Sequence, residues 1–537
     1  MIPTNRTAFL VTSGDLRLAA NQAGWPAQVE LERRLAEAVE AEGWTAQRAF
    51  DADPVTGHGF VSSQRMGMDV FANVPVDAPV IVATAVWQYS HHVLAGLRRH
   101  RGPILTIANW SGQWPGLVGL LNLNGSLTKA GVAYDSLWSE TFDDAFFREG
   151  LRSWLAGRPI EHDLSHVRRF DASSVGDDLA KVGRDVAREL AERMAILGVF
   201  DEGCMGMYNA IIDDELLNPM GLYKERLSQS ALVAEMRTVT EAEAAGVRSW
   251  LDEHGMRFHT GHDPAADLTE EQIHEQCKMY VAAVRIAERF ACDAIGIQYQ
   301  QGLKDMAPAS DLVEGLLNDP NRPPVLAASG KPIRDGLAIP HFNEVDEGAA
   351  VDALVTNRVW TRLGFEPSTT LHDLRWGERF QADGIDAFVW VFEISGAVPA
   401  SHLTGGYAGA EGYRQPPMYF PLGGSTLSGV SKPGPIVWSR VFVMEGVLHA
   451  DVGLGRSVEL PDDEVRRRRQ ATTPEWPVMN AVLHGVTRDQ MMARHKANHV
   501  QVAYAPTERD AWRAALAKAS AFDEMGMSVH LCGEVSP

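Results

Sequence analysis

Cysteine is scarce in this chain, and what is missing excludes several classes of protein. Its 537 residues include four cysteines, Cys204, Cys277, Cys292 and Cys532, and no two of them form a CxxC pair. A disulfide scaffold and a structural zinc site of that type are therefore not expected. No apolar run approaches the ~18 residues of a membrane span, and the first residues lack the pattern of a signal peptide. These absences predict a protein of the reducing cytoplasm with no membrane segment.

Positive charge is also in short supply. The chain has 49 Lys and Arg against 70 Asp and Glu, which gives a formal net charge of −21. Because nucleic acids and anionic membranes attract basic surfaces, we expect neither as a partner. There is no internal repeat and no low-complexity tract. The composition is that of a globular protein, and the length predicts about two to four domains.

Strands and helices alternate through residues 1–165. Nearly continuous apolar runs at 80–83 and 103–107 are typical of strands in a sheet that is covered on both faces. Amphipathic patterns at 90–99 and 143–155 predict helices. This alternation predicts an N-terminal doubly wound parallel sheet, in which ligands bind at the carboxyl ends of the strands.

Residues 166–345 are more helical but have the same character. Amphipathic helices are predicted within 177–197, 235–254 and 269–290. The last of these starts with a pattern close to a capping box. An apolar strand is predicted at 294–297, so we interpret this part as a second doubly wound α/β domain.

Residues 346–537 change to an antiparallel, β-rich pattern. Runs at 436–443 and 447–452 flank a Met-Glu-Gly turn and predict a hairpin. A charged run at 463–469 is interpreted as a solvated face. The predicted fold class is therefore α/β, with two doubly wound α/β domains followed by a C-terminal β-rich domain.

Three acids stand within four residues just past mid-chain: Glu344, Asp346 and Glu347. They follow an apolar run and open a helical pattern, so they either cap that helix or hold a divalent cation. Asp373 lies in a short apolar segment, where an acid costs free energy unless it is paired or bound to metal. Arg375 is its alternative partner.

His499 precedes an alternating, strand-like run. Alone, such a histidine is either a hydrogen-bonded group or a ligand. Together with Glu344 and Asp373 it would supply two carboxylates and one imidazole nitrogen, a set that suits Mn²⁺, Mg²⁺ or Co²⁺. His495 lies four residues before His499, but no Glu follows it, which excludes a zincin-type metalloprotease.

These segments carry a resemblance to a known family. Residues 342–346, 372–375 and 496–499 look like the three metal-binding segments of the L-fucose isomerase / L-arabinose isomerase-like family, closest to L-fucose isomerase. The segment 204–208 is similar to its Met-Gly-Met segment, and 453–461 resembles its C-terminal barrel. The resemblance covers most of the chain in outline and implies that the C-terminal β-rich domain is barrel-like.

The resemblance implies a metal-dependent aldose–ketose isomerase that acts on a monosaccharide through a cis-enediol. Glu344, Asp373 and His499 would be the metal ligands, for Mn²⁺ or else Mg²⁺ or Co²⁺. Glu344 and Asp373 would also be the catalytic acid and base, and which of them abstracts the carbon-bound proton is left open. The implied partners are a small sugar and further copies of the chain in a homo-oligomer, a hexamer by analogy.

The resemblance also implies five sugar-binding residues: Arg17, Trp87, Gln300, Ser395 and Asn498. Arg17 and Trp87 would contact a sugar in the neighbouring protomer. Their alternative interpretations are a surface salt bridge for Arg17 and core packing for Trp87.

The chain departs from the family around the far end of the sugar. Ser425 stands where the family has a tyrosine, and His91 and His92 replace the usual pattern after Trp87. We interpret the two histidines as an exposed helix start, with a substrate contact as the alternative. The substrate is therefore left open.

Two other functions remain possible at this point. One is a metal-dependent sugar-acid lyase or epimerase, which would need a cationic group near Ser395, such as Arg375 or Arg440. The other is a non-catalytic sugar-binding protein, which would not need Glu344 and Asp373.

Overall fold

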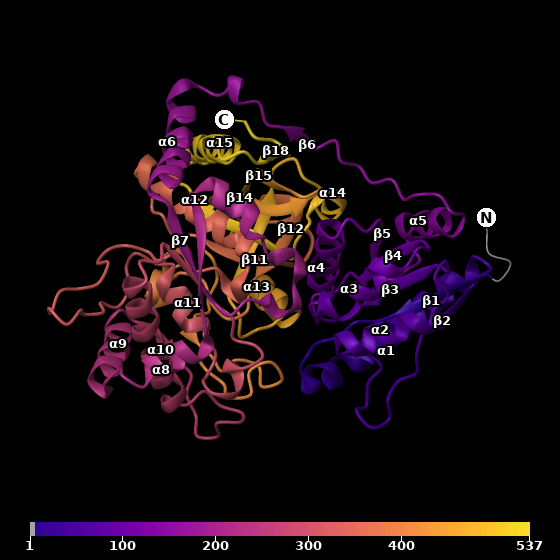
Figure 1. The fold of residues 1–537 in the computed structure, drawn as a ribbon, viewed down its shortest axis with the longest axis horizontal. Coiled ribbons are helices and arrows are strands. Elements are labelled where there is room, and N and C mark those ends of the chain that lie inside the picture. The colour runs from indigo at the N-terminus through magenta and orange to yellow at the C-terminus, as the bar shows by residue number, and fades with distance from the viewer. Residues whose placement is uncertain (1–5, 537) are drawn as a thin grey trace.

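Three regions make up the molecule (Figure 1). A computed structural model describes residues 6–536, apart from the side chain of Cys204. It has an N-terminal parallel sheet, a smaller parallel sheet among helices, and a strand-rich C-terminal sheet at the centre of the view. The mixed α/β character and the change to a strand-rich C-terminal part are as predicted, and the boundaries near residues 165 and 345 stay predictions. The first five residues, on which the signal-peptide prediction depends, lie outside the described part.

Within residues 6–536, no helix combines the length and the apolar character that crossing a membrane requires.

The N-terminal region is a five-stranded, all-parallel sheet in the order β2-β1-β3-β4-β5. Apolar clusters lie on both of its faces, with Leu10 and Ile81 on one and Val11 and Val82 on the other, so helices cover both sides as the apolar strands predict. The strands are β1 (Thr7–Val11), β2 (Thr45–Arg48), β3 (Val80–Thr84), β4 (Ile104–Asn109) and β5 (Asp135–Ser139), and the helices are α1 (Leu18–Ala41), α2 (Gln64–Asn73), α3 (Ser90–Arg99), α4 (Gly116–Lys129) and α5 (Ala145–Leu155).

The middle region is a three-stranded parallel sheet in the order β10-β7-β8. The helix predicted over 177–197 is too long: it ends at Arg193, because Met194 has a left-handed φ of +61° and the apolar run after it forms β7. Thr269 forms the predicted capping box with Gln272. The strands are β7 (Ala195–Phe200), β8 (Leu222–Leu227) and β10 (Ala294–Ile297), and the helices are α6 (Asp177–Arg193), α7 (Asp214–Leu217), α8 (Gln229–Met236), α9 (Glu241–Glu253), α10 (Glu270–Arg289) and α11 (Asp311–Leu317).

The C-terminal sheet pairs its strands antiparallel in a ring, β14-β17-β11-β12-β16-β15, and β15 pairs back to β14 through the predicted hairpin. β18 and β6 extend it beside β15. The strands are β6 (Val167–Arg169), β11 (Thr370–Ala382), β12 (Ile385–Glu393), β14 (Gly434–Met444), β15 (Val447–Ser457), β16 (Val478–Leu483), β17 (His499–Tyr504) and β18 (Ser528–Cys532), and the helices are α12 (Glu347–Leu363), α13 (Asp462–Gln470), α14 (Arg488–Arg494) and α15 (Glu508–Glu524). A separate two-stranded pair joins β9 (Arg257–Phe258) and β13 (Glu411–Gly412).

Helix α13 is mostly exposed, as the predicted solvated face implies, but it buries one arginine. Its Arg468 is fully buried and donates hydrogen bonds to the Glu464 carboxylate at 2.7 Å and to the Val389 carbonyl at 3.0 Å. These two bonds help the guanidinium to tolerate burial, although its Nη2 has no hydrogen-bond partner among the described residues.

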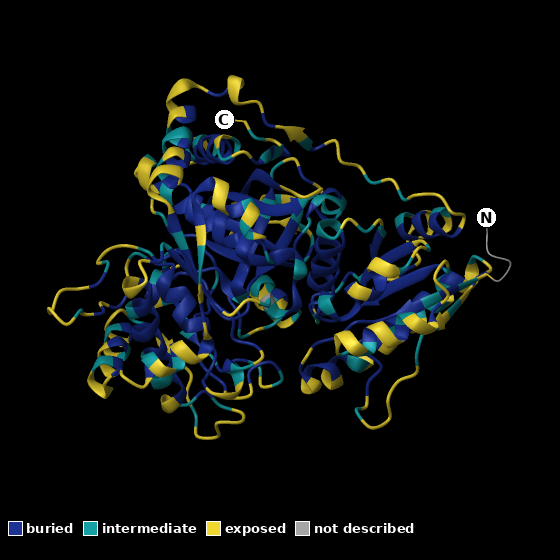
Figure 2. Ribbon diagram, in the orientation of Figure 1, coloured by how far each residue is buried: buried dark blue, intermediate teal, exposed yellow. Residues whose placement is uncertain are grey.

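The N-terminal region packs directly on the C-terminal sheet. Trp110 donates its indole N–H to the Gly377 carbonyl on β11 at 2.8 Å, and Arg375 donates to the Gly112 carbonyl at 3.1 Å. Figure 2 shows buried residues filling the strands of the central sheet, with exposed residues on outer loops and outer helix faces. The contacts hold the segment that follows β4 against the middle of β11.

Candidate active site

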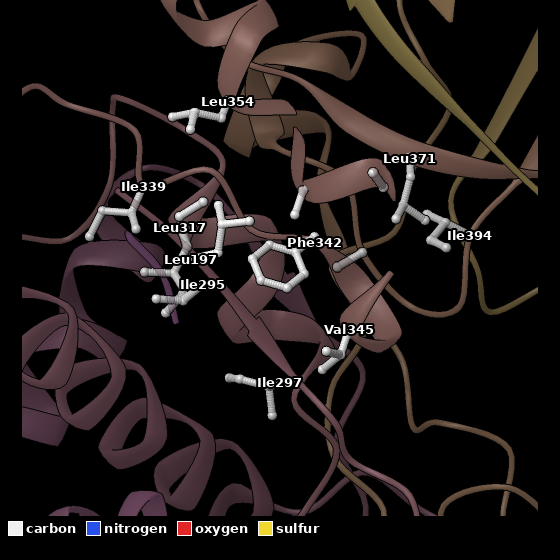
Figure 3. Packing of buried hydrophobic residues seen from close by; sticks show 14 of the residues in the cluster. Leu197, Ile295, Ile297, Leu317, Ile339, Phe342, Val345, Leu354, Leu371 and Ile394 are labelled. Atoms are coloured by element: carbon white, nitrogen blue, oxygen red, sulfur yellow. The ribbon is translucent and has the colours of Figure 1, made fainter. Parts of the chain in front are cut away.

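The segment that carries Glu344 runs beside β10. Phe342 donates its backbone N–H to the Ile295 carbonyl, and Ile295 donates to the Pro340 carbonyl, both at 3.0 Å. Phe342 and Val345 extend into an apolar core around Ile295 (Figure 3). Because both of its apolar neighbours are anchored, Glu344 is held at the end of an extended segment, on a cavity wall.

The backbone around this acid is strained. Glu344 and Val345 have left-handed φ values of +56° and +55°. Met205 on the cavity wall has a φ of +48°, and Gln301, next to cavity-lining Gln300, has a φ of +73°. Such conformations cost roughly 1–3 kcal/mol each in residues other than glycine and are found most often at functional sites.

A single cavity brings the predicted residues together. It contains about 620 Å³ of space not filled by atoms, a volume that includes solvent at its open side. Seven of the eight predicted site residues line it, and His499 lies against two of them. The seven are Arg17, Trp87, Gln300, Glu344, Asp373, Ser395 and Asn498.

The three predicted metal ligands converge on this wall. Nε2 of His499 lies 3.5 Å from Oε2 of Glu344 and 3.5 Å from Oδ1 of Asp373. The imidazole is buried, and its Nε2 has no hydrogen-bond partner among the described residues. Register explains one of these contacts, since Asp373 on β11 lies directly opposite His499 on β17.

We tested whether this group fits a metal ion. Across the part of the chain that the structure describes, no three or more His, Cys, Asp or Glu side chains already form a ready-made metal cluster. The chemistry of Glu344, Asp373 and His499 fits a hard or borderline cation, because two carboxylates on the cavity wall lie 3.5 Å from an imidazole nitrogen without a partner. The residues therefore fit the implied ion by donor type, and their ligand roles stay predictions.

The other ring nitrogen of His499 is held from behind. Nδ1 lies 2.8 Å from Oδ2 of Asp346, and Arg440 donates to the same carboxylate at 2.6 and 2.9 Å. Asp346 also accepts the backbone N–H of Ala349, so its predicted role as the cap of α12 is confirmed. A carboxylate bonded to Nδ1 orients the imidazole and directs Nε2 toward the cavity.

These environments shift the pKa values in opposite directions. Burial alone would raise the pKa of Asp346, but Arg440 and His499 outweigh burial and lower it well below its usual range. Burial raises the pKa of Asp373 to about 7, an effect that His499 opposes and Glu344 strengthens. Burial alone would lower the pKa of His499, but its contacts with Asp346 and Glu344 outweigh burial and raise it to about 10.

The N-terminal region supplies the opposite wall. Arg17 is 9% exposed and paired with Asp15, through Nε at 2.7 Å and Nη2 at 2.5 Å, and its guanidinium lies 4.6 Å from the Tyr419 ring centre. The salt bridge of the alternative interpretation is therefore present, but it is buried and not on the surface. Trp87 is buried, and its indole N–H has no partner among residues 6–536, which leaves a donor on the cavity wall.

The remaining predicted residues add polar groups between these walls. Ser395 donates to Oε1 of Glu344 at 3.3 Å, and Asn498 donates to Oδ1 of Asp373 at 3.4 Å. Oε1 of Gln300 and Oδ1 of Asn498 find no hydrogen-bond partner in the described chain. Such a set of unpaired polar groups suits a ligand with several hydroxyls.

Several residues at the site carry no recognisable local signal in the sequence. Arg440 is 94 positions from its partner Asp346, and Tyr419 supplies an aromatic ring six residues before Ser425, which is buried away from the cavity lining. Trp476, Gln298, Asp311 and Glu314 also line the cavity.

Two sequence interpretations differ from the structure. Glu347 does not serve the cap: its buried carboxylate accepts the Ile212 N–H at 2.6 Å and pairs with Lys224 at 2.9 Å. His92 is not at an exposed helix start, because it is 5% exposed and bonded to the Val61 carbonyl. In both cases the partner comes from a distant segment.

Comparison with known families covers the C-terminal part of the chain. Residues 411–518 match the family model described as L-fucose isomerase, C-terminal domain. The match supports an L-fucose isomerase-like family, as the resemblance predicted. It includes Asn498 and His499, and it begins after Glu344 and Asp373. No curated protein matches the chain.

Proposed function

We propose that this protein is a metal-dependent aldose–ketose isomerase that acts on an uncharged monosaccharide through a cis-enediol. One observation carries the proposal: Glu344 and Asp373 lie on the wall of one cavity, and Nε2 of His499, which has no hydrogen-bond partner among the described residues, lies 3.5 Å from a carboxylate oxygen of each. The family match at residues 411–518 supports a sugar isomerase independently of that geometry.

The chain's own residues account for the proton transfers. A bound Mn²⁺, Mg²⁺ or Co²⁺ would polarise the sugar carbonyl and acidify the neighbouring hydroxyl. One carboxylate of the pair Glu344 and Asp373 removes the proton from C1 or C2 and returns it to the other carbon. The second carboxylate carries a proton between O1 and O2. Ser395 and Asn498 hold the two carboxylates through the hydrogen bonds at 3.3 and 3.4 Å.

The charges around the cavity favour a neutral sugar over a sugar acid. Four carboxyl groups line it, those of Glu344, Asp373, Asp311 and Glu314, while its lining cation, Arg17, is already paired with Asp15. An anionic substrate would therefore find no unpaired Arg or Lys side chain among the lining residues.

The two arginines that a lyase or epimerase would require are engaged elsewhere. Arg440 is paired with Asp346, and Arg375 bonds the Gly112 and Gln113 carbonyls and lies 3.5 Å from Glu393. Neither lines the cavity. This arrangement favours the isomerase over the sugar-acid alternative.

The resemblance implies a homo-oligomer, a hexamer by analogy, in which Arg17 and Trp87 would serve a neighbour's site. In a single chain both side chains already line the chain's own cavity. We therefore propose that each chain completes its own site, whatever the number of subunits.

Metal analysis of the purified protein, followed by a panel of neutral aldoses with Mn²⁺, tests the function. We expect bound divalent metal and formation of a ketose from at least one aldose. Full activity of Glu344→Gln would contradict the mechanism. Unchanged Mn²⁺ affinity of His499→Ala would contradict the ligand set.

A further inference from the structure

Asp311 is a buried acid on the cavity wall that the mechanism above does not use. It is the first residue of α11 and is 2% exposed. Its Oδ2 has no hydrogen-bond partner among the described groups, although the residue lines the cavity. An unsatisfied buried polar atom costs stability, so a fold that keeps one at a cavity wall leaves it ready for a ligand.

A close backbone approach places Asp311 beside the predicted sugar contacts. A Cβ atom at Gly396 would lie 2.5 Å from Cβ and Cγ of Asp311 and 2.1 Å from Nε2 of Gln415, and the φ of Gly396 is +88°. Only glycine allows this packing. The preceding residue, Ser395, donates to Glu344 at 3.3 Å. Asp311 therefore packs against the same turn that holds a predicted catalytic acid.

The neighbour of Asp311 is fixed from its other side. Trp476 donates its indole N–H to Oε1 of Gln415 at 2.7 Å, and Gln415 is fully buried. This bond sets the orientation of the amide, so its NH₂ group is the end that faces Asp311. Trp476 lines the cavity as well. Nε2 of Gln415 is itself without a hydrogen-bond partner among the described residues, so the amide lies beside the carboxyl of Asp311 and leaves Oδ2 for a ligand.

We propose that Asp311 is a substrate-binding residue whose carboxyl hydrogen-bonds one hydroxyl of the sugar and selects among neutral sugars by the configuration at that carbon. The inference rests on the proposed function and adds a specificity-determining residue to it. A group that must pair with a hydroxyl discriminates against epimers that direct this hydroxyl elsewhere, because its polar atom is then left unpaired.

Protonation supports this role. Burial raises the pKa of Asp311 to about 8, an effect that Gln415 opposes and Glu344 strengthens. Near neutral pH the carboxyl is therefore mainly uncharged, and it both donates to and accepts from a sugar hydroxyl. Glu314, the other unassigned acid on the wall, accepts a hydrogen bond from Ser310 at 2.7 Å through Oε1, and its Oε2, which has no hydrogen-bond partner among the described residues, lies 3.9 Å from Nδ1 of His341.

Binding of neutral alditols in the presence of Mn²⁺ tests the proposal without turnover, because alditols lack the carbonyl. The probes are L-fucitol and alditols that differ from it at single carbons, and calorimetry gives each dissociation constant. For Asp311→Asn and Asp311→Ala we expect the dissociation constant of the probe that the wild type binds most tightly to rise roughly tenfold. We also expect the ratio of the dissociation constants of two probes that differ at one carbon to move toward one by a similar factor.

Asp319→Asn is the matched control. Asp319 is also buried, but its carboxylate accepts the Asn321 and Ser401 backbone N–H groups at 2.9 and 2.8 Å, and it does not line the cavity. We expect this variant to lose stability and to keep the ranking of the probes. The Asp311 variants should keep or gain thermal stability above pH 8, because they remove a carboxyl that is costly to ionise.

The outcomes separate the inference from the function. If the wild type binds none of the probes, the proposed function fails and the inference fails with it. If the wild type binds and both Asp311 variants keep its affinities and ranking, the inference is wrong and the function stands. A uniform loss of affinity together with a fall in melting temperature would make Asp311 a structural residue and would also overturn the inference.

Discussion

Carboxylates lie on both sides of the His499 ring, and those on one side are much more fully paired than those on the other. Behind Nδ1, Asp346 has its charge matched by Arg440 and its oxygens bonded to the imidazole, to the guanidinium and to the start of α12. In front of Nε2, Glu344 and Asp373 share one neutral or positive imidazole at 3.5 Å and no arginine. Glu344 is half-buried, whereas Asp346, Arg440, Asp373 and His499 are buried.

The difference shows that the groups that orient the His499 ring are distinct from the groups that would react with a ligand. The rear side is satisfied within the protein, so it stabilises the fold and orients the ring. On the cavity side the carboxylates accept single hydrogen bonds from Ser395 and Asn498, and Nε2 of His499 has no partner among the described residues. Burial raises the pKa of Asp373, so its ionisation costs stability in the free protein, and the group becomes useful when a ligand arrives. Substitutions on the two sides should therefore have opposite consequences.

The largest effect is expected on the cavity side. Replacing Asp373 or Glu344 by its amide removes a proton-transfer group, and we expect kcat for the isomerisation to fall by roughly 10³-fold, equivalent to ~4 kcal/mol. Steady-state kinetics on the best aldose measure this. The metal-free Asp373→Asn protein should be at least as stable as the wild type at pH 8: the pKa of Asp373 is raised to about 7, so its ionisation costs stability as the pH rises from about 4 to 7.

Asp386→Asn is the control for that experiment. Asp386 is an exposed acid at the start of β12, paired with exposed Arg379. Its loss should change neither kcat nor stability measurably. A tenfold loss of kcat in this control, or wild-type kcat in Asp373→Asn, would contradict the catalytic role of the carboxylates on the cavity side of His499.

The rear side should respond mainly in stability. Asp346→Asn leaves the buried guanidinium of Arg440 without its counter-charge, and we expect the free energy of unfolding to fall by ~3–5 kcal/mol. Urea denaturation measures this. The pKa of Asp346 is lowered on folding, so its contribution is present above about pH 4 and is lost as the pH falls further. Unaltered stability of Asp346→Asn at pH 7 would show that the rear pair is not structural.

Metal binding should depend on the proton of His499. Its pKa is raised to about 10 in the metal-free protein, so a cation that takes Nε2 must displace that proton. We expect Mn²⁺ affinity to rise with pH from 7 toward 10, by about tenfold per unit for each proton released. Calorimetry in buffers with different ionisation enthalpies counts the protons. Affinity that is independent of pH over this range would place the cation elsewhere.

In the last experiment, which mixes subunits of two inactive variants, we expect no recovery of activity. Mixing Arg17→Ala protein with Glu344→Gln protein after unfolding and refolding should not restore activity, because both residues line the same chain's cavity. Each cavity then keeps one defect. Recovery approaching a quarter of wild-type activity would instead show that Arg17 serves a neighbouring protomer's site, as the resemblance implies.

Local patterns in the sequence predicted most of the elements. Continuous apolar runs identified β3, β4 and β10, and the capping residues identified the start of α10. The pattern failed at residue 194, where an apolar run that looked like a helix face continued into strand β7. Helix and strand periods are hard to distinguish over such short apolar stretches.

The site was predictable only in part, and for a physical reason. Glu344, Asp373 and His499 were identified through a family resemblance, and their spacing alone would not have joined them. Pairing of β11 with β17 is what places Asp373 opposite His499. The roles of Arg440 and Asp311 depend on contacts between distant segments, for which the local sequence carries no signal.

The measurement that tests the central claim most directly is isomerisation in D₂O, followed by NMR. With Mn²⁺ and L-fucose, or the best aldose of the panel, a ketose should appear, and deuterium should enter C1 of the ketose and C2 of the recovered aldose. This result is expected because a carboxylate that removes the carbon-bound proton exchanges it with solvent during the enediol's lifetime. Ketose formation without any deuterium at either carbon, or no ketose from any neutral aldose with metal bound, would contradict the account.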